Sequence, residues 1–467
     1  MPSRKRSRLI CSLILAAGTL LPVTTVRAHG SFPDAQQILL PADRPEQIIL
    51  TTNFGLISSE DRGHTWLFSC EHGLSSFTGP YLLAPPPSAR ILALTASSGL
   101  IYSNDDSCTW NAAQGTLTGV LPYTFSVDGS AGAQRVYVVG APLSDLRAGD
   151  SIYVSDDGGV SFGAPAFTAP AGSALLTVLA APSQPSTVLA AMYSGDMHPI
   201  LLSSHDSGQH WETSADLVDS FGGNPFELLW IDAVDPDRIY VRILGPAAET
   251  LGISRDGGKS FVPAVSIPGK LSAFLRLASG TILVGGTAGI AGIGYRSTDD
   301  GHTFEPWPEA PRVHALAERN GKLYVAASNY DDGYAIAESD DEGATLKPLT
   351  GFGQVRAMKG CVAAVCAEAC SYNAAIGLWP QAVCEGASTV PEPGIDAGTG
   401  AKDAGMAGDD GPPAPADAAG EDPRVGNSGG GCGCDVGRDP PAPYGVLLPL
   451  VLIWVMARRK ARSSATP

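Results

Sequence analysis

One octapeptide pattern recurs seven times between residues 59 and 346, and it constrains the fold more than any other feature of this chain. The pattern is Ser-x-Asp-x-Gly-x-Thr-aromatic, and successive copies lie 42 to 52 residues apart. Self-similarity at such a period is typical of repeat architectures in which each copy belongs to one supersecondary unit. The seven copies begin at Ser59, Ser103, Ser155, Ser204, Ser254, Ser297 and Ser339.

The residue types of the octapeptide predict a tight turn between two β-strands. The Asp carboxylate and the Ser hydroxyl can accept hydrogen bonds from backbone amides of the turn, and glycine adopts a positive φ at little steric cost. The closing aromatic side chain then packs in the core. Because the aspartates are spread evenly over seven turns, we interpret them as structural, with calcium binding at one or two turns as the alternative. These aspartates are Asp61, Asp105, Asp157, Asp206, Asp256, Asp299 and Asp341.

The flanking sequence supplies the remaining strands of each unit. In the first unit, residues 37–40, 47–52 and 55–59 have strand character before the turn, and residues 65–69 have it afterwards. Four strands in about 40 to 50 residues is the size of one propeller blade. We therefore predict an all-β fold over residues 29–384, a seven-bladed β-propeller of four-stranded blades. Its last segment, residues 355–384, forms either a partial eighth blade or a disulfide-bonded closing cap.

The octapeptides resemble Asp-box (BNR) repeats, and residues 35–350 are similar to the Asp-box propeller superfamily. That superfamily includes bacterial sialidases, sortilin-type receptors, the photosystem II assembly factor and xyloglucan-cleaving hydrolases. The main departures from the pattern are Ser107 in place of Gly, His210 in place of Thr and Leu346 in place of the aromatic residue. The resemblance implies the propeller fold, and it leaves both enzymes and binding proteins open.

No catalytic residue can be carried over from the sialidase-like members. Their pattern has an apolar residue between an Arg and a Pro before the first repeat, whereas Arg44 directly precedes Pro45 here. The xyloglucan hydrolases also pair two propellers, and this chain has one. We therefore expect a non-catalytic binding or scaffold module for a protein or carbohydrate ligand. The alternative is a sialidase-like glycoside hydrolase, because a glycosidase carboxylate pair leaves little local signature.

Candidate binding residues follow from propeller topology. The connections between second and third strands lie on the face opposite the octapeptide turns, around the mouth of the central channel. On this reading, the mouth is acidic and favours a cationic partner or a metal ion over an anionic sugar. The alternative is that these residues are ordinary solvated loops. The candidates are Asp145, Arg147, Asp150, Asp196, His198, Glu249, Asp331 and Asp332.

Six of the nine cysteines are expected to form disulfides, because an even number in an exported chain indicates a disulfide framework. Cys70 and Cys108 lie on consecutive units and are the expected first pair. The other four would form two bridges in the last segment, with three connectivities open. A zinc site built from the same cysteines is the alternative. The four are Cys361, Cys366, Cys370 and Cys384.

Both ends of the chain carry targeting signals. Residues 1–28 combine a basic start, a short apolar run and a small residue before the expected cleavage site, which predicts a secretory signal peptide. Residues 385–430 are rich in Pro, Gly, Ala and Asp and have almost no large apolar side chains, so we expect a disordered stalk.

The last segment, residues 431–467, combines Cys432 and Cys434 with a short apolar run and a basic end. It resembles the C-terminal sorting tag of myxobacterial surface proteins. The resemblance implies a sorting protease as a partner, lipid attachment at the cysteines and anchoring at the cell surface. An ordinary membrane tail is the alternative, and in either case membrane contact is confined to this tail. A net charge of −17 without a basic stripe argues against nucleic acid as a partner.

Overall fold

The computed structural model describes residues 33–385 apart from 71–77, 85–89, 96–98, 129–133, 147, 290 and 309. The predicted signal peptide and sorting tag, and all but the first residue of the predicted stalk, lie outside the described residues. Among the residues described, no helix is both long enough and apolar enough to cross a membrane.

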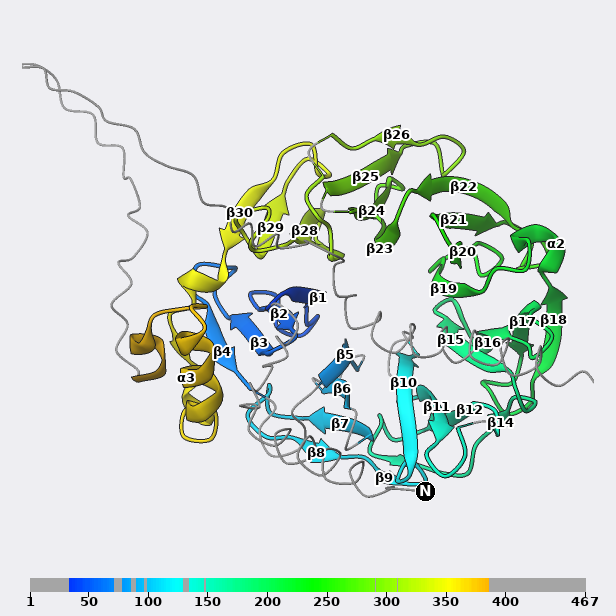
Figure 1. Cartoon of the computed structure of the whole chain (residues 1–467), viewed down its shortest axis with the longest axis horizontal. Helices are drawn as coiled ribbons and strands as arrows, with labels where there is room; N and C mark the ends of the chain where they lie inside the picture. Colours follow the sequence, from blue (N-terminus) through cyan, green and yellow to red (C-terminus); the bar gives the residue numbers. More distant parts are fainter. Residues whose placement is uncertain are drawn as a thin grey trace, which may run out of the picture. The chain divides into compact units, whose positions relative to one another are not determined.

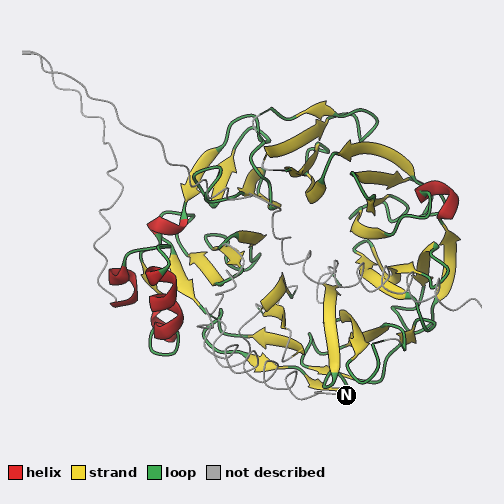
Figure 2. Ribbon diagram, viewed as in Figure 1, coloured by secondary structure: helices red, strands yellow, loops and turns green. Residues whose placement is uncertain are grey.

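Seven four-stranded antiparallel sheets are arranged in a ring, which confirms the predicted seven-bladed propeller (Figure 1). In each sheet the strands follow chain order from the first strand, next to the central channel, to the fourth strand at the periphery. Strands dominate the described chain, and the helices are few and short (Figure 2). The prediction of an all-β fold is therefore also confirmed.

The strands of the first four blades have the following bounds. Blade 1 contains β1 (Ala35–Leu39), β2 (Ile48–Thr52), β3 (Gly55–Ser59) and β4 (Leu67–Ser69). Blade 2 contains β5 (Thr78–Leu83), β6 (Ile91–Thr95), β7 (Gly99–Ser103) and β8 (Asn111–Ala112). Blade 3 contains β10 (Val120–Val127), β11 (Val136–Pro142), β12 (Ser151–Ser155) and β14 (Phe167–Thr168), while β9 (Gln114–Gly115) and β13 (Ser161–Phe162) pair beside it. Blade 4 contains β15 (Ala174–Ala181), β16 (Gln184–Tyr193), β17 (Pro199–Ser204) and β18 (Glu212–Asp216).

The remaining three blades complete the ring. Blade 5 follows a short helix, α2 (Val218–Phe221), and contains β19 (Phe226–Ile231), β20 (Ile239–Leu244), β21 (Glu249–Ser254) and β22 (Val262–Ile267). Blade 6 contains β23 (Lys270–Arg276), β24 (Ile282–Ala288), β25 (Ala291–Ser297) and β26 (Glu305–Pro306). Blade 7 contains β27 (Ala315–Arg319), β28 (Lys322–Ala326), β29 (Ile336–Ser339) and β30 (Lys347–Thr350).

Each octapeptide forms the turn between the third and fourth strands, with its serine as the last residue of the third strand. In the first copy, Ser59 Oγ accepts from the Gly63 amide at 2.7 Å and donates to Asp61 Oδ1 at 2.7 Å. Asp61 also accepts from the amide and the hydroxyl of Thr65, at 2.8 and 2.5 Å. The same four hydrogen bonds occur in all seven copies, so the predicted role of the Ser and Asp side chains is confirmed.

Two departures from the pattern keep this geometry. Ser107 adopts φ +68° where the other copies have glycine, and its hydroxyl lies 3.0 Å from Ser69 Oγ of blade 1. His210 replaces the threonine hydroxyl with Nδ1, which lies 2.5 Å from Asp206 Oδ2. Leu346, in the aromatic position, is half-buried against the core between blades 6 and 7.

The segment after blade 7 forms a cap on blade 1. Its short strand β31 (Ala357–Met358) pairs in parallel with β4 and gives blade 1 a fifth strand. The cap also contains η1 (Phe352–Gln354), η2 (Gly360–Val362), α3 (Ala367–Ala375) and η3 (Gln381–Glu385). Trp379 of the cap packs on Phe68 with ring centroids 4.9 Å apart. The segment is therefore a closing cap and not a partial eighth blade.

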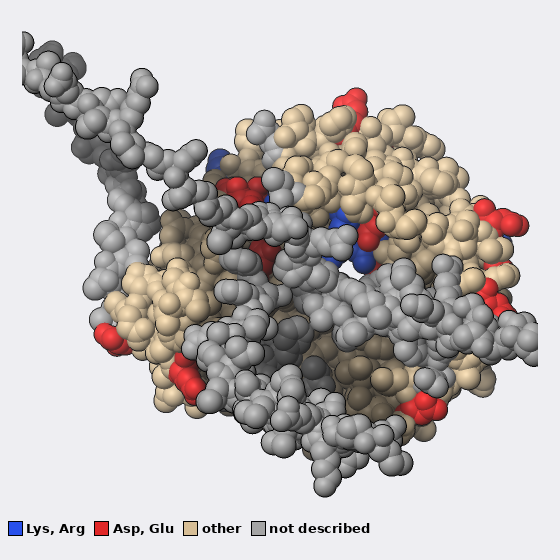
Figure 3. Space-filling view, viewed as in Figure 1, with Lys and Arg blue, Asp and Glu red and all other residues tan. Residues whose placement is uncertain are grey.

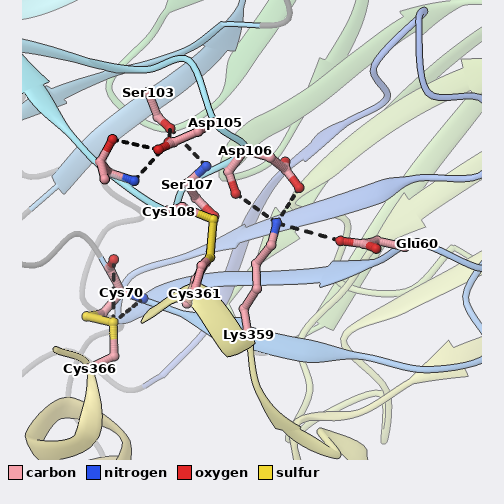
Figure 4. The surroundings of a disulfide bond; sticks show 12 residues. Glu60, Cys70, Ser103, Asp105, Asp106, Ser107, Cys108, Lys359, Cys361 and Cys366 are labelled. Carbon is pink, nitrogen blue, oxygen red and sulfur yellow. Dashed lines mark hydrogen bonds and ion pairs between the residues drawn. A yellow bond between two sulfur atoms is a disulfide. The ribbon is translucent and has the colours of Figure 1, made fainter. Parts of the chain in front are cut away.

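Two disulfides join this cap to the first two blades, and they correct the expected pairing of Cys70 with Cys108 (Figure 4). Cys70 pairs with Cys366 and Cys108 pairs with Cys361, whereas the third bridge, Cys370 to Cys384, lies within the cap. The reason is topological, because the closing segment returns along the outer edge of blade 1 and passes between Cys70 and Cys108. With all six cysteines oxidised, the alternative of a zinc site at these residues is wrong.

A buried lysine strengthens the same contact. The Lys359 side chain is 10% exposed, and its Nζ donates to the Asp106 backbone oxygen at 2.8 Å and to the Asp106 carboxylate. Glu60 lies 3.7 Å from the same ammonium (Figure 4). Arg44 of blade 1 reaches the Asp106 carboxylate at 2.8 Å. The cap and blades 1 and 2 are thus joined by ion pairs as well as by disulfides.

We expect Cys108→Ser/Cys361→Ser to destabilise the protein more than Cys370→Ser/Cys384→Ser does. The first bridge spans 253 residues and the second 14, and the loss of chain entropy in the unfolded state grows with loop length. We expect costs of about 5 to 6 and about 3 kcal/mol, respectively, in denaturant unfolding. Equal costs would contradict the closing role of the long-range bridge, and peptide mapping that links Cys70 to Cys108 would contradict the pairing itself.

Candidate functional site

A cavity of about 460 Å³ lies on the axis of the ring. The first strand of every blade contributes to its wall, and most of the wall is therefore formed by strands that have no neighbouring strand on the channel side. A cavity of this size is within the range of small-ligand sites. Its lining includes Gln36, Leu82, Tyr123, Leu176, Glu227, Ser272 and Ala315, with Arg242 from a second strand and His314 next to β27.

Asp150 and Glu249, two of the predicted mouth residues, each connect their own blade to the next one. Asp150 is buried, and its carboxylate accepts from the Leu175 amide of blade 4 at 2.8 Å. Tyr123 of blade 3 donates to the carbonyl of the same Leu175 at 2.8 Å. Burial raises the pKa of Tyr123 well above its ordinary value, and the Asp150 charge raises it further. Asp150 and Tyr123 therefore clamp the first strand of the next blade.

Glu249 has the equivalent role between blades 5 and 6. Its carboxylate accepts from the Leu271 amide at 2.7 Å, and Arg242 Nη1 donates to the Leu271 carbonyl at 2.7 Å. Arg242 also pairs with Glu227 at 2.5 Å, and both side chains are about 90% buried. Burial raises the pKa of Glu249, and the nearby Arg242 charge partly offsets this effect. This network therefore fixes the position of β23.

Asp331 and Asp332 organise the connection between β28 and β29. The Asp331 carboxylate pairs with Arg312 and accepts from the Ser328 hydroxyl at 2.8 Å. The Asp332 carboxylate accepts from the amides of Arg312 and Ser328, each at 3.1 Å. Their oxygens are thus engaged by groups of the protein itself.

The other predicted mouth residues have different surroundings. Asp145 and Asp196 are exposed on their loops, and Arg147 lies outside the described residues. His198 Nδ1 is 2.8 Å from Asp216 at the end of the outermost strand of blade 4, and this contact raises the pKa of His198. Among the seven described candidates, Asp150, His198, Glu249, Asp331 and Asp332 are thus engaged in separate contacts of blades 3, 4, 5 and 7.

Except for Arg147, the residues predicted at the mouth include no Lys or Arg, because they come only from the connections between second and third strands. The segments that enter the first strands lie on the same face. These segments and the adjoining strands contribute Lys270, Arg312 and His314, and β20 contributes Arg242. Acidic and basic side chains lie next to each other near the centre of the ring (Figure 3). The expectation of a uniformly acidic mouth was wrong.

Asp34 and His314 meet at the mouth, where blade 7 joins blade 1. His314 Nε2 lies 3.2 Å from Asp34 Oδ2, and the His314 side chain is 12% exposed. Burial raises the pKa of Asp34 to about 7, and the carboxylates of Asp331 and Asp332 add to this shift. Burial lowers the pKa of His314 to about 4, assisted by the charges of Arg312 and Lys270. At pH 7 His314 is therefore neutral, and the Asp34 carboxyl is near the midpoint of its titration.

Within the described part of the chain, no three or more His, Cys, Asp or Glu side chains converge as metal ligands would. The alternative of calcium at an octapeptide turn therefore stays a prediction. The turn carboxylates are engaged by amide and hydroxyl donors, which lower the pKa of Asp299 and Asp341 to about 2.

No protein-family model matches this sequence, and no curated protein matches it. Among solved structures, the chain is similar to YCF48 from Cyanidioschyzon merolae, with 12% identity, a TM-score of 0.47 and coverage of 68% of this chain and 98% of that chain. It is also similar to the GH74 enzyme of Niastella koreensis, with 15% identity, a TM-score of 0.35 and coverage of 69% and 66%. An oligogalacturonate lyase in complex with manganese shares 10% identity, with a TM-score of 0.46 and coverage of 66% and 89%. Similarity at this level supports no conclusion about ligand or activity.

We expect Arg242→Met to destabilise the protein by about 3 to 5 kcal/mol, because it leaves Glu227 and Glu249 buried without their cation. The measurement is the free energy of unfolding in urea. Adding Glu227→Gln to this variant should restore part of the loss. An unchanged stability of Arg242→Met would show that the network does not hold blades 5 and 6 together.

Proposed function

We propose that the chain is an exported Asp-box β-propeller that binds a ligand at the mouth of its central channel without chemical turnover. The observation that carries this proposal is the axial cavity, to which all seven blades contribute. Its mouth combines polar and charged side chains with apolar walls, which is the usual composition of a ligand site.

Exposed apolar side chains around the mouth support a binding role. Leu143 and Leu146 lie in the connection from β11 to β12, Met197 in the connection from β16 to β17 and Tyr330 in the connection from β28 to β29. They are 55%, 45%, 38% and 53% exposed, respectively. Apolar side chains on the rim of a polar site give a large ligand additional contact area.

A glycoside hydrolase is the second candidate, and Asp34 is the observation that favours it. A carboxyl group with a pKa of about 7 keeps a proton near neutral pH, as the general acid of a glycosidase must. A catalytic function would also require a second carboxylate at the correct distance across the ligand.

The two functions are separated by incubating the purified protein with a panel of polysaccharides and chromogenic glycosides. We expect retention on at least one polysaccharide with no release of reducing sugar. Turnover that Asp34→Asn abolishes, with Asp196→Asn as the matched surface control, would contradict the binding proposal and identify a hydrolase. If the protein neither binds nor cleaves any of these carbohydrates, carbohydrate is excluded as its ligand. The retention assay is then repeated with proteins.

We further propose that the signal peptide exports the protein and that residues 431–467 anchor it at the cell surface. The arrangement of Cys432 and Cys434, a short apolar run and a basic end supports this proposal. We expect Cys432→Ser to release the protein into the medium or to retain it in the inner membrane, as measured by protease accessibility on intact cells. Ser464→Ala in the same tail is the control. Unchanged surface display of Cys432→Ser would contradict the role of the tag.

A further inference from the structure

Four shielded polar atoms along the channel find no hydrogen-bond partner among the described residues. They are Lys270 Nζ, His314 Nε2, Gln36 Oε1 and Ser126 Oγ. The residues of the last three line the axial cavity, and Lys270 is the first residue of β23, two positions before the cavity residue Ser272. Polar groups withdrawn from water without a partner are costly. Three of them belong to residues of one cavity, and the Lys270 ammonium is near enough to His314 for its charge to lower the pKa of that imidazole, so together they point to a ligand.

The acidic groups next to these atoms are already engaged, and so are the guanidinium groups of Arg242 and Arg312. By contrast, Lys270 Nζ and His314 Nε2 form no hydrogen bond with the described residues. Glu227 binds Arg242, Glu249 accepts from the Leu271 amide and Asp331 binds Arg312. His314 Nε2 lies near Asp34 but outside hydrogen-bond geometry. The unused hydrogen-bonding capacity at the mouth is therefore that of a cationic donor, Lys270, beside an imidazole nitrogen. A carboxylate ligand would satisfy the ammonium.

The unpaired atoms of Gln36 and Ser126 have a different chemistry. Gln36 Oε1 accepts a hydrogen bond, and Ser126 Oγ can donate or accept one. Ser126 lies three residues beyond Tyr123 along β10, which corresponds to about 10 Å of strand. A ligand that reaches from the mouth to Ser126 is therefore longer than a simple carboxylate ion and carries hydroxyl groups along its length.

We propose that the channel mouth binds a sugar acid, a uronate unit of an acidic polysaccharide, with its carboxylate at Lys270 and its hydroxyl groups at Gln36 and Ser126. This inference rests on the proposed function, because it names the ligand class of the same site. The sequence predicted a cationic partner, but the basic side chains at the mouth favour an anionic ligand instead.

Asp34 gives such a site a characteristic pH profile. Its carboxyl faces Arg312, His314, Tyr330, Asp331 and Asp332, which belong to the segments around β27 and the connection from β28 to β29. Because the pKa of Asp34 is raised to about 7, its negative charge appears as the pH rises through 7 and then repels a carboxylate ligand. Uronate binding should weaken between pH 6 and pH 8, and Asp34→Asn should flatten this change.

The test is calorimetric titration of the full exported protein with trigalacturonate and, as the matched neutral probe, its trimethyl ester. We expect the acid to bind at least about tenfold more tightly than the ester. Lys270→Met should remove this preference, whereas Lys347→Met, at a lysine that is 64% exposed on blade 7, should not. The Lys270→Met variant should unfold at the same temperature as the parent or a higher one, because it removes an unpaired shielded charge. Gln36→Leu should weaken binding of the trisaccharide without changing that of acetate.

Each result has a defined meaning. Equal binding of acid and ester would overturn the carboxylate assignment while leaving a saccharide-binding channel in place. Preference for a peptide with a free C-terminal carboxylate over both saccharides would overturn the sugar-acid assignment. Binding of neither saccharide would also overturn it, and the broader binding proposal would then be judged by its own screen of polysaccharides and proteins. A Lys270→Met variant that folds normally and keeps the preference for the acid would overturn the role of Lys270.

Discussion

The side-chain hydrogen bonds of the octapeptide turn are the interaction on which the ring depends. A serine and an aspartate bind backbone amides two and four residues away, so the reversal at the outer edge of each blade is stabilised by its own residues. Because the turn needs no partner from another blade, the residue after it is free to pack between blades. Trp66 shows this coupling, since its ring is 2% exposed and its indole nitrogen donates to the Gly63 carbonyl of the same turn.

The inner edge of the ring is stabilised by hydrogen bonds between blades, from side chain to backbone. At several blade junctions a polar side chain of one blade binds the backbone of the segment that begins the next. Gln37 accepts from the Tyr81 amide, Thr177 accepts from the Leu228 amide, and Asp150 and Glu249 act in the same way on Leu175 and Leu271. The side chains differ from junction to junction, but the target is a backbone group at the open edge of a first strand. This explains why acidic residues gather at the mouth.

The sequence could predict the blades because the necessary information is local. Each turn depends on residues within an octapeptide, and the strands around it follow from short apolar segments. The disulfides depend on separations of 296 and 253 residues, which no local pattern records. Ring closure could nevertheless have predicted these pairs, because a closed ring must bring the segment after blade 7, with its cysteines, next to blade 1. Lys270, His314 and Asp34 were missed for a similar reason, since they come from three blades and meet only when the ring is closed.

Two lysines show why the unpaired donor at the mouth is informative. Lys359 and Lys270 each have an ammonium with little access to water, but only Lys359 is surrounded by acceptors, two from Asp106 and one from Glu60. The charge of Lys359 thus contributes to closing the ring. The ammonium of Lys270 forms no such bond in the described chain, and burial and the nearby Arg242 charge lower its pKa. Packing alone would be served equally well by an apolar side chain of similar shape. The charges of Glu249 and Glu227 act on this ammonium, but neither carboxylate accepts a hydrogen bond from it. This missing acceptor is the basis on which we propose an anionic ligand.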